Sequence, residues 1–283
     1  MEKVGKLYLV ATPIGNLEDI TLRALRVLKE VDLIACEDTR HTRKLLTHFD
    51  IHKPLVSYHE HNEKARAEEL IRELTAGKNI ALVSDAGTPG ISDPGYDVVS
   101  AAIAAAVRVI PVPGASALIV SLIGSGLPTN EFHFVGFLPS KSSARKEKLE
   151  SLTTVTTTLI FYEAPHRLKA MLQDLLGTLG NRHAVVAREL TKLHEEFRRD
   201  NLTNLIETLD EHSTRGEFVI IVEGATGTLP QEQGTIVEQV QSLMELSGLT
   251  KMEAIKQVAR SRGLSKNEVY QQVIPKTDEH SKY

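Results

Sequence analysis

Short apolar runs alternate with amphipathic helical patterns over the first ~125 residues of the chain. The predicted strands span 7–11, 31–35, 54–57, 79–83 and 107–112, and the predicted helices span 21–30, 39–48, 63–76, 95–106 and 115–124. Strands that alternate with helices are typical of crossover connections between parallel strands. The pattern therefore predicts a parallel sheet with helices on both of its faces.

A cluster of turn-forming residues, Gly124–Pro128, interrupts this alternation, and we interpret it as a domain boundary. Beyond it, the predicted strands span 132–137, 157–162, 184–189, 195–199 and 218–223, and the predicted helices span 144–152, 166–177 and 201–212. The strands 184–189 and 195–199 are close enough in sequence to pair as a hairpin. The second half is therefore predicted to be another α/β domain, built on a mixed sheet.

The C-terminal segment repeats one helix-start signal three times. Thr235–Glu238, Thr250–Glu253 and Ser265–Glu268 each match the S/T-x-x-E capping box, and apolar residues at helical spacing follow each of them. Three short helices joined by tight turns resemble a helix-turn-helix module. The predicted domains are therefore 5–125, 130–226 and 233–275.

Composition narrows the class of protein. The chain has 283 residues, 41% of them hydrophobic, and a formal net charge of −4, which excludes a strongly basic, histone-like nucleic-acid binder but not an RNA enzyme with local basic patches. The single cysteine, Cys36, forms no intrachain disulfide and fits a reducing compartment. A strand predicted close to Met1 leaves no room for a signal peptide, and no apolar run approaches the ~18 residues of a membrane span. We expect a soluble, cytoplasmic protein.

Two loops of small residues follow successive predicted strands. Ser84–Gly95 reads SDAGTPGISDPG and follows the strand 79–83, and Pro113–Ala117 follows the strand 107–112. Glycine and alanine allow a ligand to approach the main chain closely, and open α/β sheets bind ligands at the carboxyl ends of their strands. We interpret these loops as the floor of a small-molecule site, although glycine and proline also punctuate ordinary turns.

Polar residues follow three other predicted strands, at 12–16, 37–40 and 163–167. If these strand ends converge, they form one cleft lined by both α/β domains. The chain has no G-x-x-x-x-G-K-[ST], H-E-x-x-H, C-x-x-C or G-x-S-x-G motif. We interpret His59–His61, which reads His-Glu-His, as a solvated loop rather than as metal ligands, and we expect no metal.

Six ordered motifs resemble one known family. LYLVATPIGNLEDIT, ACEDTR, SDAGTPGISDPG, PVPGASA, FYEAPHR and GEFVIIVEG resemble the tetrapyrrole-methylase superfamily of S-adenosylmethionine-dependent methyltransferases, over about residues 6–274. The resemblance is greatest to the branch that methylates a cytidine 2′-hydroxyl in 16S rRNA. It implies two α/β domains with S-adenosylmethionine in the cleft between them, a homodimer, and 16S rRNA or the 30S subunit as partner.

Two alternatives remain open at this point. One is a methyltransferase of the same superfamily with a tetrapyrrole or diphthine-type substrate, and the other is a non-catalytic RNA-binding assembly protein. The basic helical tail and the ACEDTR and FYEAPHR motifs argue against the first. The intact small-residue loops argue against the second.

The resemblance implies roles for particular residues. The implied cofactor site comprises Ile14, Asp85, Thr88, Ser116, Ala117, Tyr162, Ala164, Ala187 and Phe218. Where tetrapyrrole methylases have a Gly-Asp-Pro loop, this chain has Ser84-Asp85-Ala86, which keeps the acid and loses the proline. An aspartate here could also cap a helix or form a turn.

A ribose hydroxyl is a weak nucleophile, so a base that accepts its proton would help. The catalytic candidates are Glu37, Asp38, Glu163 and His166 as the base, with Arg40 and Arg167 positioning phosphate. Arg167 could instead pair with a carboxylate, and His166 could cap a helix. The predicted RNA contacts are Arg43, Lys44, Lys141, Arg145, Lys146, Lys251, Lys256, Arg260, Arg262 and Lys266, unless these charges only solvate helix faces.

Overall fold

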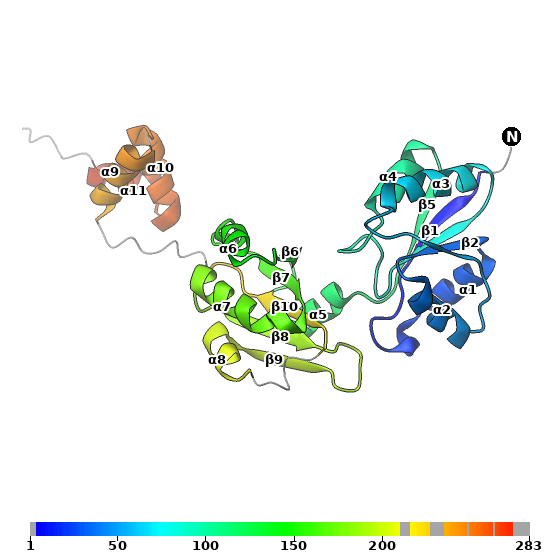
Figure 1. The fold of residues 1–283 in the computed structure, drawn as a ribbon. Helices are drawn as coiled ribbons and strands as arrows, with labels where there is room; N and C mark the ends of the chain where they lie inside the picture. Colours follow the sequence, from blue (N-terminus) through cyan, green and yellow to red (C-terminus); the bar gives the residue numbers. More distant parts are fainter. Residues whose placement is uncertain (1–3, 210–215, 227–234, 248, 263, 274–283) are drawn as a thin grey trace, which may run out of the picture. The chain divides into compact units, whose positions relative to one another are not determined.

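The computed structural model describes residues 4–209, 216–226, 235–247, 249–262 and 264–273. The chain divides into two compact units (Figure 1). The first contains residues 1–153 and 157–224, and the second contains 154–156 and 225–283. Both α/β sheets belong to the first unit, so the division predicted at Gly124–Pro128 falls inside it.

The first sheet is fully parallel, as the sequence predicts. Its strands are β1 (Lys6–Val10), β2 (Leu33–Cys36), β3 (Leu55–Ser57), β4 (Ile80–Val83) and β5 (Arg108–Val112), in the spatial order β3-β2-β4-β1-β5. The carboxyl ends of parallel strands meet at one edge, so the loops after β1, β4 and β5 are neighbours there.

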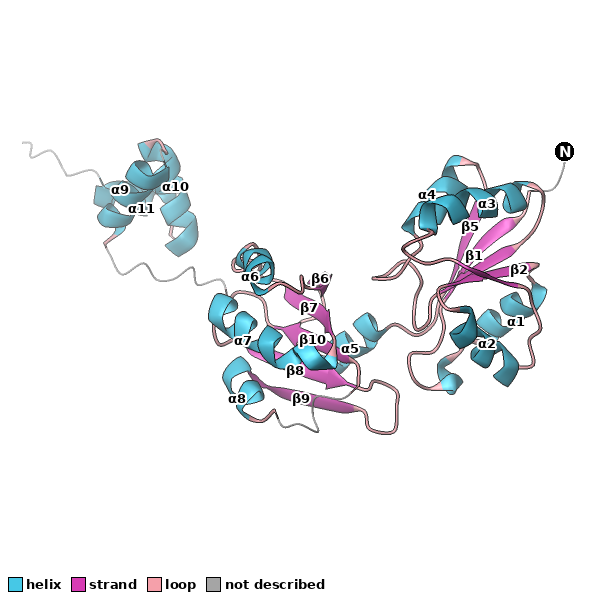
Figure 2. Ribbon diagram, in the orientation of Figure 1, coloured by secondary structure: helices cyan, strands magenta, loops and turns pink. Residues whose placement is uncertain are grey.

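Helices cover both faces of this sheet, which confirms the prediction (Figure 2). On one face lie α1 (Leu22–Glu30) and α2 (Thr39–His48), and on the other lie α3 (Glu63–Thr75) and α4 (Tyr96–Ala104). A short 3-10 helix, Leu17–Asp19, precedes α1. Each face has its own apolar core, with Val27 and Leu28 of α1 in one and Leu70 and Leu74 of α3 in the other.

The helix α5 (Ala117–Ser125) forms where the pattern predicts it, but it packs on the second sheet instead of completing the first. Its Leu122 shares a buried cluster with Ile160, Val185 and Ile221. The helix is almost entirely apolar, so its sequence predicts burial without showing against which sheet. In the structure, one side of it stays open, with Ile119 45% and Ile123 69% exposed. The chain therefore passes from the first sheet to the second at 113–116, before the turn cluster at Gly124–Pro128.

The second sheet is mixed, as predicted. Its strands are β6 (Phe132–Phe137), β7 (Thr158–Glu163), β8 (His183–Arg188), β9 (Glu196–Asn201) and β10 (Phe218–Val222), in the order β6-β7-β10-β8-β9. The strands β6 and β7 are parallel and the other pairs antiparallel, including the predicted hairpin of β8 and β9.

Three helices pack side by side in this half of the first unit (Figure 2). They are α6 (Ser142–Glu150), α7 (Leu168–Leu179), which follows the 3-10 turn Pro165–Arg167, and α8 (Leu202–Glu207). The helix predicted over 201–212 is shorter, because α8 ends at Glu207, and 210–212 lie outside the described residues.

The second unit contains α9 (Ile236–Ser247), α10 (Lys251–Arg262) and α11 (Lys266–Val273) around a small apolar core that includes Val240 and Ile255. All three predicted capping boxes form. In the second, the Thr250 amide donates to Glu253 Oε2 at 3.0 Å and the Glu253 amide donates to Thr250 Oγ1 at 3.4 Å. No helix among the described residues is both long and apolar enough to cross a membrane.

Candidate active site

Hydrogen bonds tie together the loops that follow β1, β4 and β5. The amide of Thr12 donates to the Gly87 carbonyl at 2.9 Å, and the amide of Gly87 donates back to Thr12 at 3.0 Å. The Thr12 hydroxyl also donates to the Ser84 carbonyl at 3.2 Å, and Thr88 Oγ1 donates to the Ala115 carbonyl at 3.2 Å. These bonds hold bare main chain in a fixed position at the edge of the first sheet.

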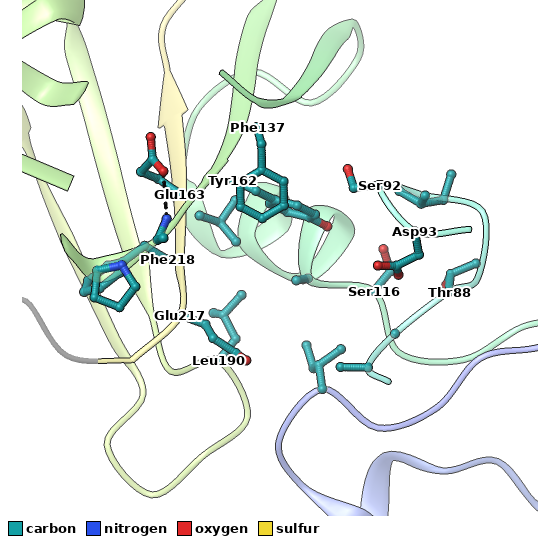
Figure 3. A pocket seen from close by; sticks show the side chains of 18 residues that line it. Thr88, Ser92, Asp93, Ser116, Phe137, Tyr162, Glu163, Leu190, Glu217 and Phe218 are labelled. Carbon is teal, nitrogen blue, oxygen red and sulfur yellow. Dashed lines mark hydrogen bonds between the residues drawn. The ribbon is translucent and has the colours of Figure 1, made fainter. Parts of the chain in front are cut away.

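A cavity of about 350 Å³ lies beside these loops and is lined by residues of both sheets and their loops (Figure 3). Small-molecule sites in proteins typically measure about 300–1,000 Å³. Seven of the predicted cofactor residues line it: Ile14, Thr88, Ser116, Ala117, Tyr162, Ala164 and Phe218. The cavity thus takes residues from the strand ends at 12–16 and 163–167, whereas the strand end at 37–40, predicted to share the cleft, lies outside its lining.

Aromatic and apolar groups form much of the cavity wall. The rings of Phe137 and Tyr162 meet edge to face with centroids 5.6 Å apart, and Leu190 and Val219 add aliphatic surface. Gly87 has φ +81°, and a Cβ added there would lie 3.3 Å from Ile14 Cγ2. The backbone at this point thus occupies a conformation and a space that favour glycine.

Three carboxylates line the cavity, and their surroundings differ. Glu217 is mostly exposed and lies 3.2 Å from Lys192 Nζ. Glu163 is buried at the end of β7, where its Oε1 accepts a hydrogen bond from the Ala164 amide at 2.8 Å. Its Oε2 is buried without a hydrogen-bond partner, so a ligand donor could satisfy it. Burial, followed by the nearby charge of Glu37, raises the pKa of Asp93 to about 6.

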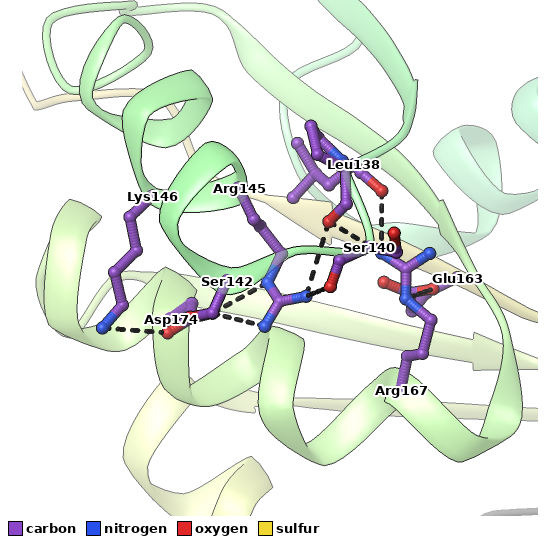
Figure 4. Close-up of polar contacts among 9 residues, drawn as sticks. Leu138, Ser140, Ser142, Arg145, Lys146, Glu163, Arg167 and Asp174 are labelled. Carbon is purple, nitrogen blue, oxygen red and sulfur yellow. Dashed lines mark hydrogen bonds and ion pairs between the residues drawn. The ribbon is translucent and has the colours of Figure 1, made fainter.

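Arg167 pairs with a carboxylate, which was the alternative to phosphate binding. Its Nε lies 3.2 Å from Glu163 Oε1, and its Nη2 donates to the carbonyls of Leu138 at 2.7 Å and Pro139 at 3.1 Å (Figure 4). Arg167 thereby joins the cavity carboxylate of Glu163 to the chain segment that follows Phe137. Its position indicates a structural role beside the cavity.

The prediction that Arg145 contacts RNA requires correction. The side chain is 6% exposed, and its Nη2 lies 2.6 Å from Asp174 Oδ2. Its Nε donates to the same oxygen at 2.7 Å, and its Nη1 donates to the Ser140 carbonyl at 3.2 Å (Figure 4). A guanidinium that is buried and occupied in this way is not available to a phosphate. The basic run around it predicts an exposed helix face, but Asp174 of α7 draws this one side chain inward.

Two predicted cofactor residues lie outside the cavity lining. Asp85 is half-buried, and its Oδ1 accepts a hydrogen bond from the Asp38 amide at 3.1 Å, so it joins the loops after β4 and β2. Ala187 is fully buried in the apolar cluster beneath α5. Its neighbours in that cluster, Tyr162 and Val219, are the residues that reach the cavity.

The remaining catalytic candidates also lie outside the cavity lining. Asp38 caps α2 by accepting from the Arg40 amide, and its carboxylate lies 2.7 Å from Arg40 Nη2; these contacts lower the pKa of Asp38. His166 is exposed in the 3-10 turn before α7. Glu37 is half-buried, and burial, followed by the charge of Asp85, raises its pKa.

The structure also brings residues to the cavity that sequence reasoning did not select: Ile91, Ser92, Asp93, Phe137 and Leu190. Strained backbone marks two of these places, since φ is positive at Ser92 (60°) and at both neighbours of Leu190, Glu189 (49°) and Thr191 (65°). Such strain persists where the surrounding structure enforces it, often at functional sites. The sequence signal for Asp93 is its place in SDAGTPGISDPG, but a turn explains it equally well.

The residues predicted to contact RNA are distributed over several elements of the structure. Arg43 and Lys44 line an open groove on α2 together with Arg40 and His48. Exposed side chains are found at Lys141, Lys146, Lys251, Lys256 and Lys266. Arg262 donates to Gln239 at 2.8 Å, and the side chain of Arg260 lies outside the described residues.

We expect Tyr162→Phe to lower the free energy of unfolding by about 1 kcal/mol, because the Tyr162 hydroxyl accepts a hydrogen bond from the Leu118 amide at 3.1 Å in the first turn of α5. Denaturant titration measures this change. The matched control is Tyr96→Phe, whose side chain is 77% exposed and should leave stability unchanged. Equal stability of the two variants would show that this bond contributes nothing.

Solved structures define the class of fold. The chain superposes on uroporphyrin-III C-methyltransferase from Thermus thermophilus with a TM-score of 0.55 at 22% identity, covering 77% of this chain and 97% of that one. A diphthine synthase superposes with a TM-score of 0.59 at 16% identity, covering 78% and 90%. Residues 6–206 match the family described as Tetrapyrrole (Corrin/Porphyrin) Methylases. The chain belongs to this family, and its fold is that of these α/β methyltransferases.

Closer relatives place it within that family. A protein of Halalkalibacterium halodurans is 52% identical, over 94% of this chain and 93% of its own. A protein of Synechocystis is 52% identical over 95% and 97%, and one of Bacillus subtilis is 47% identical over 94% and 93%. All three are named ribosomal RNA small subunit methyltransferase I, and the chain belongs to their branch of the tetrapyrrole methylases.

Proposed function

We propose that this protein transfers the methyl group of S-adenosylmethionine to the 2′-hydroxyl of a cytidine in 16S rRNA. The observation that carries the proposal is the match, along nearly the whole chain, to relatives named as small-subunit rRNA methyltransferases, together with a cavity of cofactor size at the predicted place. The RNA is presented either free or within the 30S subunit. The homodimer implied by the family resemblance and the cytoplasmic location expected from the composition stay predictions.

The residues around the cavity fit S-adenosylmethionine. The cofactor combines an adenosine, an amino acid and a sulfonium cation, and it supplies an electrophilic methyl group for displacement. The aromatic and aliphatic wall formed by Phe137, Tyr162 and Leu190 suits a heteroaromatic ring. The unpartnered Glu163 Oε2 suits a donor, and the glycine at 87 admits a ligand close to the main chain.

In-line methyl transfer depends mainly on alignment of the acceptor oxygen, the methyl carbon and the sulfur. The bonds among Thr12, Gly87, Thr88 and Ala115 fix one wall of the cavity, and the Tyr162 hydroxyl fixes the start of α5 beside it. The protein's contribution at this level is a rigid, largely apolar site that holds the two reactants in line and limits the access of water.

The groove on α2 is a place where the RNA backbone can bind. Its lining carries Arg40, Arg43 and Lys44, all exposed, and it begins at Thr39, three residues after β2 ends at Cys36. Phosphate contacts of this kind position an RNA without reading its sequence. They also make affinity fall steeply as the salt concentration rises.

The test is transfer of labelled methyl from S-adenosylmethionine to purified 30S subunits, with 16S rRNA alone in parallel. We expect label on one ribose 2′-oxygen, located by nuclease digestion and mass spectrometry. Gly87→Val, whose Cβ would lie 3.3 Å from Ile14 Cγ2, serves as the control with weakened cofactor binding and should label less RNA at low cofactor concentration. If the wild-type protein binds the cofactor but labels neither RNA, the rRNA substrate is wrong, and tetrapyrrole precursors and diphthine-type protein substrates are the next to assay.

A further inference from the structure

The loop that follows β3, Tyr58–Asn62, contains a His-Glu-His sequence that the proposed function does not use. The sequence predicts a solvated loop here, but His59 is half-buried. The Tyr58 amide donates to the Cys36 carbonyl at 2.8 Å, so the loop starts beside the end of β2. Because β2 and β3 are neighbouring parallel strands, the loop lies next to Glu37 at the carboxyl edge of the first sheet.

Asn62 holds the ring of His59 in one orientation. Its Oδ1 accepts from the His59 amide at 2.9 Å and its Nδ2 donates to the Ser57 carbonyl at 3.3 Å, so these two backbone partners assign the donor end of the side-chain amide. The same Nδ2 lies 3.2 Å from His59 Nε2, which therefore accepts a hydrogen bond. A neutral imidazole with Nε2 as acceptor carries its hydrogen on Nδ1, and a protonated ring carries one on each nitrogen. In either state, Nδ1 is a donor.

This donor has no partner in the protein. His59 Nδ1 is buried, and no acceptor of the described residues forms a hydrogen bond with it. The ring of His61 meets that of His59 edge to face, with centroids 6.0 Å apart, and it supplies no such bond. Buried polar groups are nearly always hydrogen-bonded, and an exception indicates strain, a catalytic role or a missing partner. A ligand atom with a lone pair would satisfy His59 Nδ1.

An acceptor, the carboxylate of Glu37, lies near this donor. Burial is the largest influence on the pKa of Glu37 and raises it, the charge of Asp85 raises it further, and the nearby charge of His59 lowers it. The next residue, Asp38, donates its amide to Asp85 Oδ1 at 3.1 Å, so the main chain beside Glu37 is fixed to the loop after β4. The edge of the sheet thus presents an acceptor and a donor from two neighbouring strand ends.

The pair lies close to the cofactor cavity and to the groove on α2. Burial raises the pKa of Asp93 in the cavity wall, and the charge of Glu37 raises it further, so Glu37 is near the cavity although it is outside the lining. The groove begins at Thr39, two residues after Glu37. A nucleotide with its phosphate in the groove and its ribose at the cavity would have its base within reach of the pair.

We infer that Glu37 and His59 recognise the base of the acceptor nucleotide as cytosine. This inference rests on the proposed function. A base that is unstacked from an RNA loop is read by hydrogen bonds to its Watson–Crick edge. In cytosine, that edge presents an amine donor at N4 next to an acceptor at N3. Glu37 accepts from the N4 amine, and His59 Nδ1 donates to N3.

Uracil presents the opposite order of groups at the same edge. Its O4 is an acceptor and its N3 carries a hydrogen, so a uracil in this position would set its carbonyl against the Glu37 carboxylate and its N3 hydrogen against the donor of His59. Polar groups left unpaired in this way reject a ligand more strongly than a missing apolar contact does. The pair therefore selects cytosine over uracil.

The test compares 30S subunits reconstituted with cytidine or with uridine at the labelled position, and it measures kcat/KM for methyl transfer to each. The wild-type protein should prefer cytidine by about 5- to 150-fold, the usual range for a base-reading pair of hydrogen bonds. Glu37→Gln should bring this preference to within about threefold of unity, because a carboxamide can rotate to accept from N4 or to donate to O4. His59→Ala should raise KM for the cytidine substrate, lower the preference and change kcat little.

Two controls make the same exchanges at exposed positions. Glu60→Gln alters an exposed carboxylate of the same loop, and His52→Ala removes a side chain that is 84% exposed. Both should keep the wild-type preference for cytidine. All four variants should bind S-adenosylmethionine with the wild-type Kd in calorimetry, because none of the exchanged residues lines the cavity. This binding also reports that the variants fold.

The remaining outcomes are decisive. Equal labelling of cytidine and uridine by the wild-type protein would overturn the inference and leave methyl transfer to rRNA in place, and so would variants that keep the preference. If Glu37→Gln labels neither substrate at saturating RNA, Glu37 takes part in the transfer itself and the inference is wrong. If His59→Ala does not fold, Glu37→Gln decides alone. If the wild-type protein labels no rRNA, the proposed function fails, and this inference fails with it.

Discussion

Arg145→Ala should lower the free energy of unfolding of the first unit by about 3–5 kcal/mol, the usual cost of removing one partner of a buried ion pair. The loss leaves Asp174, whose side chain is 11% exposed, with Lys146 at 3.5 Å as its remaining charged partner. It also removes a donor from the Ser140 carbonyl. Chemical denaturation followed by circular dichroism measures the change.

Two controls separate the buried charge from the lost side chain. Arg26→Ala removes an exposed arginine that pairs with Glu30 at 2.9 Å, and it should cost no more than about 0.5 kcal/mol. The double variant Arg145→Met/Asp174→Leu removes both charges and should recover most of the stability. A single variant as stable as Arg26→Ala would mean that the Arg145–Asp174 pair does not stabilise the fold.

Gly87→Val should raise the Kd for S-adenosylmethionine by about 5- to 150-fold, the equivalent of about 1–3 kcal/mol of overpacking. The valine Cβ would lie 3.3 Å from Ile14 Cγ2, and its methyl groups would take up part of a cavity of about 350 Å³. Calorimetric titration of the purified variant with the cofactor measures the effect.

Gly90 provides a matched control for this prediction. It has φ +83°, close to the +81° of Gly87, but nothing lies within 4 Å of a Cβ placed there. Both Gly87→Val and Gly90→Val should lose about 1–2 kcal/mol of stability from the left-handed backbone conformation. The variants should differ in cofactor affinity, and equal affinities would show that the space beside Ile14 is not part of the cofactor site.

The sequence was sufficient to predict both sheets because most strands are short apolar runs bounded by turn residues, and that pattern is local. The polar strand β9, EFRRDN, was predicted from its closeness in sequence to β8, with which it forms a hairpin. The capping boxes at Thr235, Thr250 and Ser265 were equally predictable, since both partners lie within four residues. The packing partner of α5 was not predictable. A helix that is apolar on all sides carries no information about which of two sheets it covers.

The same limit applies to the site: local sequence patterns predicted some of its residues, but not the contacts between residues that are distant in sequence. Ile14, Thr88 and Ser116 lie in loops of small residues directly after strands, so strand order alone brings them together. Burial raises the pKa of Asp93, and the charge of Glu37, which is 56 residues away in sequence, raises it further. In the sequence, Arg145 cannot be distinguished from the basic residues around it. Its burial depends on the contact with Asp174, which lies 29 residues later in the chain.

The position of α5 has a consequence for dividing the molecule into separately expressed fragments. A fragment that begins after the turn cluster at Gly124–Pro128 lacks this helix and exposes the apolar face formed by Ile160, Val185 and Ile221. Such a face promotes aggregation. A fragment intended to retain the second sheet in soluble form should therefore begin near Pro113, where the chain leaves β5. Such a fragment includes α5, which keeps this apolar face buried.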